Sequence, residues 1–270
     1  MTRTIKEWSL NVEAAFQRAL ATCGGTQSEE RISADAQDYW SGPDTDRWRA
    51  NSHWRDAQIF ADGDLWHHLG AQHLAMLERG ARAVDFARPW DRVIEWGCGG
   101  GANAVHFASR ANEFIGVDVS GDSVTECGNQ VAAVCDTRYV PVTIEVSRPE
   151  RAIDDVGAGT CDIFLSFYVF ELIPTQHYGE RLLRIAHQLL ARGGLALVQI
   201  KYDDGRWWTR SRHRAYRSGL ARMTTYTISG FWQLGERCGL EPVSVELAPD
   251  NELDGRYAYF LFSKPYSDHS

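Results

Sequence analysis

From residue 92 to residue 200 the chain alternates between strand-like and helix-like segments, and this alternation limits the fold more than any other feature. Short β-branched and apolar runs predict strands, and longer amphipathic stretches predict helices. Repeated units of this length build a doubly wound α/β fold, a mostly parallel sheet with helices on both faces. In chain order the predicted segments are strand 92–96, helix 102–111, strand 113–118, helix 122–134, strand 140–146, strand 162–167, helix 178–190 and strand 195–200.

The C-terminal part has a different pattern. A predicted helix over 229–238, capped by Ser229 and stopped by Gly239, precedes two alternating strand patterns, 243–247 and 257–263. A polar loop joins these two strands, which predicts an antiparallel pair at one edge of the sheet. The complete prediction is a seven-stranded, mostly parallel sheet with an antiparallel last strand.

The N-terminal part lacks this regular alternation. Trp8, Val12, Phe16 and Leu20 recur at four-residue intervals, which predicts an amphipathic helix and not a secretory signal. The following segment, 24–63, is polar, interrupted by glycines and rich in aromatic residues, so we expect irregular structure that covers the main domain.

A second helix pattern over 65–79 leads into the first predicted strand. We therefore expect two parts: a helical and aromatic N-terminal extension over 1–70, and a main domain over 71–265. Within the main domain, 201–227 is expected to be an insertion that covers the substrate.

The net charge and the apolar runs indicate which kinds of binding partner the protein has. The formal net charge is -8 at pH 7, which disfavours nucleic acid, and the apolar runs are too short to span a membrane. The six cysteines show no paired spacing of a disulfide framework or a metal site. These features predict a cytoplasmic protein with reduced thiols, no metal and a small-molecule partner, and they leave room for a homodimer.

The most informative motif is the glycine-rich turn after the first strand. A strand that ends in glycines and opens a helix lets the backbone approach a ligand closely. Gly97, Gly99 and Ala102 also satisfy the dinucleotide-binding pattern, so a nicotinamide cofactor is an alternative. Glu95 separates the two interpretations, because a carboxylate would repel a pyrophosphate and attract a cationic sulfonium.

With this acidic residue, the turn resembles the first motif of the class I S-adenosylmethionine-dependent methyltransferases. That motif is an acid followed by alternating glycines, here Glu95, Gly97, Gly99 and Gly101, with Cys98 between them. The order of elements supports the resemblance from about residue 71 to 265. It implies S-adenosylmethionine as the cofactor and S-adenosylhomocysteine as the product.

The second strand ends in Asp118, about twenty residues after the turn, where a carboxylate accepts the ribose hydroxyl hydrogens. The resemblance implies that Val119 and Ser120 line the adenosine. Further cofactor contacts are expected at the ends of the third and fourth strands and from the aromatic N-terminal segment: Glu145, Val146, Ser147, Phe167, Tyr168 and Arg55.

Methyl transfer from a sulfonium needs alignment above all, and a general base helps where the acceptor must lose a proton. Ligands of open α/β sheets bind beyond the carboxyl ends of the strands. There His177, Glu171 and Tyr168 are the candidate catalytic residues. Contact with the substrate is expected from two clusters that combine aromatic and basic residues: His53, Trp54, Trp207, Trp208 and Arg212.

The sequence thus predicts a methyltransferase that acts on an oxygen or nitrogen atom of an aromatic, acidic or lipid-like small molecule. Two alternatives remain open at this stage. One is an NAD(P)-dependent oxidoreductase, and the other is a non-catalytic cofactor-binding protein of the same fold.

Overall fold

The computed structural model describes residues 27–42, 45–60, 64–211, 216, 223–248 and 255–266. The helix expected around Trp8–Leu20 lies outside these residues. Across the described part of the chain, no helix is both long enough and apolar enough to cross a membrane.

The core of the molecule is one seven-stranded sheet with the order β3-β2-β1-β4-β5-β7-β6. β7 is antiparallel to both of its neighbours, and the other neighbouring pairs are parallel. The prediction of a mostly parallel sheet with an antiparallel last strand is confirmed. In chain order the strands are β1 (Trp90–Trp96), β2 (Ala111–Asp118), β3 (Arg138–Thr143), β4 (Cys161–Ser166), β5 (Leu190–Lys201), β6 (Glu241–Leu247) and β7 (Tyr257–Ser263).

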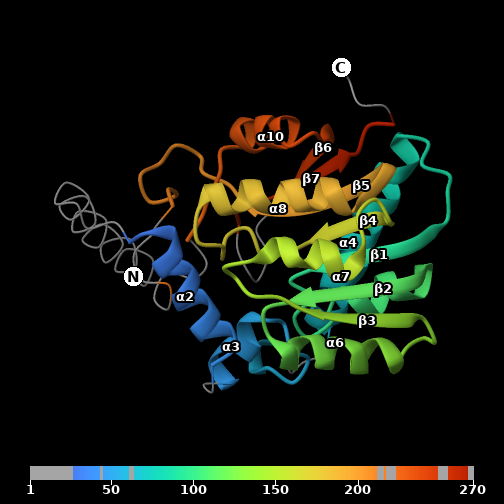
Figure 1. Cartoon of the computed structure of the whole chain (residues 1–270), viewed down its shortest axis with the longest axis horizontal. Coiled ribbons are helices and arrows are strands. Elements are labelled where there is room, and N and C mark those ends of the chain that lie inside the picture. The colour runs from blue at the N-terminus through green and yellow to red at the C-terminus, as the bar shows by residue number, and fades with distance from the viewer. Residues whose placement is uncertain are drawn as a thin grey trace.

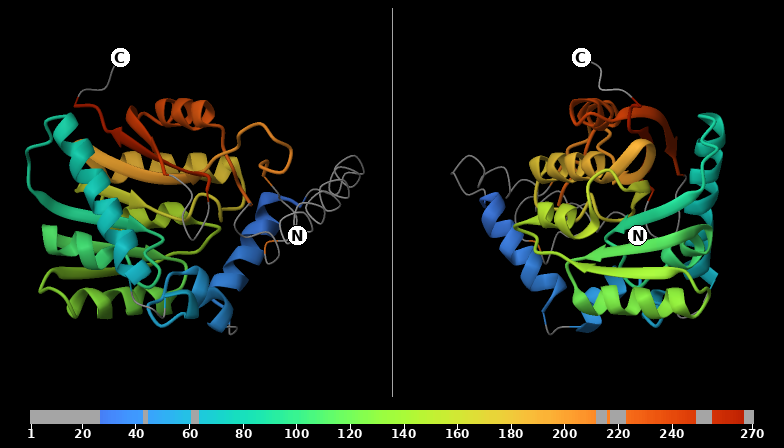
Figure 2. Two further views of the ribbon diagram at one scale, coloured as in Figure 1. Left: turned by 180° about the vertical axis from the view of Figure 1, so that it is seen from behind. Right: turned by 45° about the vertical axis from the view of Figure 1, so that its right-hand side comes forward.

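Helices cover both faces of the sheet because the central strands carry apolar side chains on both sides. All six residues of β4 are buried, so neither of its faces meets water. One face packs against α4 (Asp64–Ala83), α5 (Ala104–Phe107) and α6 (Gly121–Ala132). The other packs against α7 (Ala152–Val156), α8 (Gln176–Leu189) and α10 (Ile228–Arg237), and Figures 1 and 2 show the three layers.

The N-terminal segment is more ordered than the sequence suggested. Where irregular structure was expected over 24–63, the chain forms α2 (Glu29–Trp40), α3 (Thr45–Asn51) and the short 3-10 helix η1 (Gln58–Phe60). α2 begins at Ser28, whose hydroxyl accepts the backbone N–H of Arg31. Figure 1 shows α2 and α3 beyond the ends of the parallel strands, where a ligand of this fold binds.

Aromatic residues explain this order. Ile32, Ala36, Tyr39 and Trp40 recur on one side of α2 and are buried against the main domain. The sequence pattern was visible, but nothing in it showed which surface these side chains would cover.

The helix cap predicted at Ser229 is wrong. The N-cap of α10 is Thr227, whose hydroxyl accepts the backbone N–H of Gly230, and the helix begins at Ile228. Threonine and serine are both favourable N-cap residues, so the sequence did not show whether the helix begins after Thr227 or after Ser229. Gly239 does follow the end of this helix, with a left-handed φ of 84°.

Candidate cofactor and acceptor site

A pocket opens at the carboxyl ends of β1, β2 and β4. It encloses about 830 Å³ of empty space, its open mouth included. Its lining combines residues of the glycine-rich turn with residues of α2, α8 and the loop after α3. The pocket therefore lies where the N-terminal segment meets the main domain.

The glycine-rich turn forms one wall, and its glycines are required by geometry. Gly97, Gly99 and Gly101 have φ angles of 76°, 49° and 86°. The loop after α3 lies directly on this turn, since the carbonyl oxygen of Ser52 accepts the N–H of Gly100 at 2.7 Å. A Cβ atom on Gly99 would overlap that same carbonyl oxygen.

Asp118 connects this wall to the end of β2. Its Oδ2 atom accepts the N–H of Gly99 at 3.0 Å, and Oδ1 accepts the N–H of Ser120 at 2.9 Å. Burial raises the pKa of the Asp118 carboxyl, and these backbone donors act in the opposite direction. A carboxylate offers about four acceptor positions, so Asp118 keeps capacity for a ligand in the pocket that it lines.

Glu95 lies behind the turn in a buried polar chain. Asn103 donates its Nδ2 hydrogen to Glu95 Oε1 at 2.7 Å and accepts from His73 Nδ1 at 2.7 Å. His73 Nε2 is thereby left to accept the hydroxyl of Tyr259 at 3.1 Å. The second oxygen of Glu95, Oε2, is buried and has no hydrogen-bond partner among the described residues.

The charge state of Glu95 follows from this burial. Desolvation raises its pKa to about 8, and the nearby Asp118 carboxyl adds to the rise, while the hydrogen bond from Asn103 lowers it. Burial also lowers the pKa of His73 to about 4, so this imidazole is neutral. Without a cation nearby, Glu95 therefore holds its proton at neutral pH.

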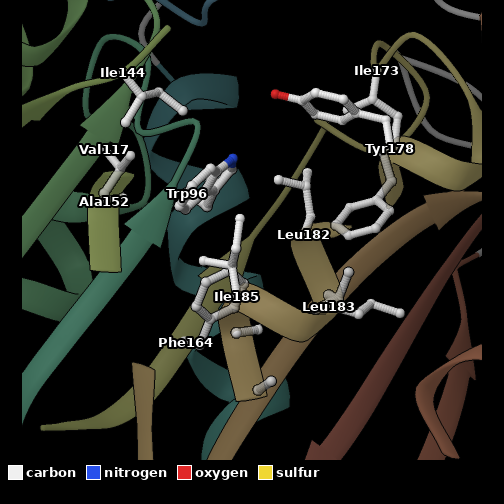
Figure 3. Close-up of a cluster of buried hydrophobic side chains, with 14 of the residues drawn as sticks. Trp96, Val117, Ile144, Ala152, Phe164, Ile173, Tyr178, Leu182, Leu183 and Ile185 are labelled. Atoms are coloured by element: carbon white, nitrogen blue, oxygen red, sulfur yellow. The ribbon is translucent and has the colours of Figure 1, made fainter. Parts of the chain in front are cut away.

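The opposite wall is apolar. Figure 3 shows the indole of Trp96, at the end of β1, with Ile144 on one side and Leu182 and Tyr178 on the other. All four residues line the pocket, and Trp96 also stacks on Phe164 with the ring centroids 6.3 Å apart. This surface suits a flat, poorly hydrated group.

Two segments far apart in the sequence close the pocket from outside. Trp40 at the end of α2 donates its indole N–H to the hydroxyl of Tyr216 at 2.6 Å, and both residues line the pocket. Tyr39 packs edge-on against Tyr216 at 5.9 Å between ring centroids. The N-terminal segment and the segment after β5 thus meet over the site.

His53 and Tyr168 are non-glycine residues of the pocket lining with a left-handed backbone, at φ angles of 53° and 56°. Their rings lie edge to face, 4.6 Å between centroids. A left-handed backbone costs of order 1–3 kcal/mol at each of these residues. Both lie where the loop after α3 contacts the loop after β4.

Many of the residues predicted to bind the cofactor line the pocket. Three others, Glu95, Gly101 and Ser120, lie directly behind the lining and hydrogen-bond to residues that form it. The predicted cofactor residues in the lining are Gly97, Cys98, Gly99, Asp118, Val119, Val146, Phe167 and Tyr168.

Three predicted cofactor residues lie elsewhere. Glu145 is exposed and forms an ion pair with Arg148 at 2.6 Å, and Ser147 is also exposed. Arg55 is exposed as well, with its guanidinium over the ring of Trp66. The side chains after β3 that do face the pocket are apolar, because buried and exposed residues alternate along this segment.

Of the proposed catalytic residues, Tyr168 lines the pocket and the other two do not. The side chain of His177 is 73% exposed, and its Nδ1 atom lies 3.3 Å from Glu29 on the outer surface. Glu171 is buried, but outside the lining.

The predicted substrate residues divide in the same way. His53 lines the pocket, whereas Trp54 is buried beside it and donates its indole N–H to Ser123 at 3.3 Å. Trp207 and Trp208 pack against each other at 5.5 Å, away from the pocket. Arg212 lies outside the described residues.

Several lining residues escaped the sequence prediction, and most are apolar residues whose role depends on which surface they face. The glycine and acid motifs carried no signal for them, although Trp40 belonged to the aromatic cluster noted in the N-terminal segment. The principal ones are Trp40, Asn51, Ser52, Trp96, Asn103, Ile144, Leu172, Ile173, Pro174, Tyr178, Leu182 and Tyr216.

Comparison with known proteins places this geometry in a family. The family described as "Methyltransferase domain" matches residues 65–245. The chain belongs to this family, the class I S-adenosylmethionine-dependent methyltransferases, and its cofactor is S-adenosylmethionine. No curated protein gives a significant match to the chain.

Solved structures share the fold at low sequence identity. A 1,6-didemethyltoxoflavin N1-methyltransferase from Burkholderia thailandensis, with its substrate and S-adenosylhomocysteine bound, has a TM-score of 0.55 at 18% identity, covering 77% of this chain and 81% of that one. The N-methyltransferase NodS from Bradyrhizobium japonicum WM9 has a TM-score of 0.54 at 13% identity, covering 76% and 99%.

The same fold also carries other reactions. The [4+2]-cyclase SpnF has a TM-score of 0.52 at 15% identity, covering 67% of this chain and 77% of that one. These likenesses establish the architecture, and the reaction must be argued from the site.

Proposed function

We propose that this protein transfers a methyl group from S-adenosylmethionine to an oxygen or nitrogen atom of a small molecule. The observation that carries the proposal is a single pocket in which the Asp118 carboxylate and the glycine-rich turn face a wall of aromatic and aliphatic side chains. The nicotinamide alternative is set aside, because the family to which the chain belongs uses a different cofactor.

The residues of the pocket fit the cofactor. Asp118 has free acceptor capacity for ribose hydroxyl groups, and Val119, Ile144 and Val146 offer an apolar surface for the purine. The unpartnered Oε2 atom of Glu95 suits the positively charged end. When bound, S-adenosylmethionine supplies a methyl group already activated by its sulfonium.

The apolar wall favours an aromatic or lipid-like acceptor over an acidic one. Among the described lining residues no lysine or arginine is present, so an acidic acceptor would find no matching charge there. Tyr178, Trp40 and Tyr216 present aromatic surface instead. These side chains would exclude water and hold the acceptor in line, which is the main contribution that methyl transfer requires.

We extend the proposal to the organisation of the chain. Residues 1–70 and 201–227 act as covers of a main domain over 71–265, and the hydrogen bond between Trp40 and Tyr216 supports this division. A cytoplasmic location is supported by the five described cysteines, which are free thiols.

Calorimetric titration with S-adenosylhomocysteine tests the donor half of the proposal. We expect micromolar binding that Asp118→Ala weakens about tenfold, equivalent to about 1.4 kcal/mol. Asp154→Ala, at an exposed position on α7, is the matched control and leaves the affinity unchanged. Absence of binding by the wild type would remove the proposed cofactor role.

Transfer itself requires a second measurement, because the fold alone does not determine the reaction. We expect label to pass from methyl-tritiated S-adenosylmethionine to members of a panel of hydroxy- and amino-substituted aromatic compounds. Tight cofactor binding without label transfer to any acceptor, from this panel or from cell extracts, would favour the non-catalytic alternative.

A further inference from the structure

We propose that His53 is the catalytic base that removes the proton from the hydroxyl or amine of the acceptor. This inference rests on the proposed function, and it assigns the proton transfer to a residue of the loop after α3. It replaces the earlier candidate His177, which lies on the outer surface.

The backbone at His53 is held on two sides. Its carbonyl oxygen accepts the indole N–H of Trp66 from α4 at 2.7 Å. The same oxygen lies so close to the glycine-rich turn that a Cβ atom on Gly100 would approach it to 2.8 Å. These contacts hold the backbone of His53 at a left-handed φ of 53° despite its energetic cost. Strained backbone conformations of this kind are common at functional sites.

The imidazole ring is positioned by two aromatic neighbours. Tyr168, directly after β4, lies at 4.6 Å and Phe60 at 5.2 Å between ring centroids, and both meet the His53 ring edge-on. His53 and Tyr168 line the pocket. Among the described residues, none forms a hydrogen bond with either ring nitrogen of His53.

The surroundings keep this imidazole in its base form. Desolvation lowers the pKa of His53 to about 4, so the ring is neutral throughout the physiological range. Within the described part of the chain, the titratable groups that face it are His73 from α4, which is also neutral, and the hydroxyl of Tyr168, whose pKa burial raises well above its ordinary value. The neutral imidazole has a lone pair that can accept a proton, and it is poorly suited to bind the methionyl carboxylate. The low pKa makes it a weaker base than an ordinary histidine, and the transfer is driven by the acceptor proton, which becomes strongly acidic as the bond to the methyl carbon forms.

The proton and electron balance of the step is complete. The acceptor oxygen or nitrogen forms the bond to the methyl carbon, the carbon–sulfur bond breaks, and its electron pair stays on sulfur. The acceptor proton moves to a ring nitrogen of His53, so the positive charge passes to the imidazole. The low pKa of the ring favours rapid return of that proton to water at the open mouth of the pocket.

The replacement His53→Asn tests this role. Asparagine tolerates the left-handed backbone better than other non-glycine residues, so the fold of the loop is preserved. His68→Asn is the matched control, because His68 is an exposed histidine on α4. Phenol and thiophenol serve as probe acceptors, since the thiol ionises readily and needs no base.

We expect His53→Asn to reduce transfer to phenol by a factor of about 100 to 1,000, while transfer to thiophenol changes less than about threefold. The affinity for S-adenosylhomocysteine, measured by calorimetry, is expected to stay within about twofold. Equal losses with both acceptors, or a tenfold loss of affinity, would show that His53 holds the cofactor or the loop and would overturn the assignment.

A second measurement needs no turnover. Diethyl pyrocarbonate modifies neutral, accessible imidazoles, and mass spectrometry can follow its reaction at His53 between about pH 5.5 and pH 7.5. We expect a nearly constant rate at His53, whereas free N-acetylhistidine slows as it protonates near its ordinary pKa of about 6.5. An unreactive His53, or a rate that falls like that of the reference, contradicts the assignment.

The outcomes separate the two proposals. A wild-type protein that does not bind S-adenosylhomocysteine removes the proposed function itself. A wild-type protein that binds the cofactor and methylates phenol, with a His53→Asn variant that is equally active, removes only the role of His53.

Discussion

The two sides of the pocket are built in different ways. The donor side, from Glu95 to Asp118, is nearly continuous in sequence and is held by backbone hydrogen bonds such as Gly99 N–H to Asp118. The cover side brings together Trp40, Tyr178 and Tyr216 from three distant parts of the chain through packing and one indole hydrogen bond. The donor side therefore depends on backbone geometry, whereas the cover side depends on side-chain shape.

This difference predicts which changes abolish cofactor binding and which only loosen the cover. At Gly99 and Gly100 on the donor side, neighbouring main-chain atoms occupy the space that a side chain would need. Aromatic positions on the cover side can adjust at a cost of about 1 kcal/mol for a hydrogen bond.

The largest effect is expected for Gly99→Ala. The added Cβ atom would overlap the carbonyl oxygen of Ser52, and alanine disfavours the φ of 49°. We expect the affinity for S-adenosylhomocysteine to fall by about 100-fold or more, equivalent to about 2.7 kcal/mol, in a calorimetric titration. Gly205→Ala, which also has a left-handed φ but no neighbouring atoms within 4 Å of its Cβ position, controls for backbone strain alone. Equal affinities in the two variants would contradict the close packing of the loop after α3.

A smaller, pH-dependent effect is expected for Glu95→Gln. The pKa of Glu95 is raised from 4.5 to about 8, so the folded protein binds a proton that the unfolded chain releases above about pH 4.5. The stability of the wild type contributed by this group is full below pH 4.5 and is lost as the pH rises through 8. Glutamine does not titrate, so between pH 5 and pH 8 the variant gains about 3.5 kcal/mol in unfolding free energy relative to the wild type.

Urea denaturation at the two pH values measures this difference, and cofactor titration of the same variant completes the test. The variant should be more stable at pH 8 and yet bind S-adenosylmethionine less tightly, because it cannot become an anion that would balance the positive charge of the cofactor. A constant stability difference across this pH range would show that Glu95 is ionised in the free protein.

On the cover side, Trp40→Phe is expected to lower the unfolding free energy by about 1 kcal/mol, because the N–H donor to Tyr216 is lost while most of the ring remains. Hydrogen exchange should quicken in α2, and the affinity for S-adenosylhomocysteine should stay within about twofold. Tyr216→Phe and the double variant complete a mutant cycle. A tenfold loss of cofactor affinity in Trp40→Phe would mean that the two sides are coupled.

The smallest effect is expected for His177→Ala. Its ring is largely exposed, outside the pocket, and near Glu29. We expect cofactor affinity to change less than twofold and unfolding free energy by no more than about 0.5 kcal/mol. A loss of transfer activity of tenfold or more would restore the original assignment of this histidine as a catalytic residue.

Much of the fold was predictable because it depends on local patterns. The alternation of strands and helices, the glycine-rich turn and the acid at the end of β2 are written in neighbouring residues, and the predicted sheet is observed. The failures have a common cause. Glu145 and Ser147 were selected by their distance from β3, whereas alternation along the chain turns both outward.

The sequence alone determined the class of the fold, through the alternation of strand and helix patterns, and the cofactor, through a short motif whose backbone conformation requires glycine at fixed positions. Only the tertiary structure decided the acceptor side. Trp40, His53, Tyr178 and Tyr216 come from separate segments, and a side chain contributes to such a surface only through the packing that orients it. The sequence predicted covers over 1–70 and 201–227 and a substrate contact at His53, but local patterns carry no information on which distant side chains meet. The contact between Trp40 and Tyr216 and the position of His53 as a candidate base therefore became visible only in three dimensions.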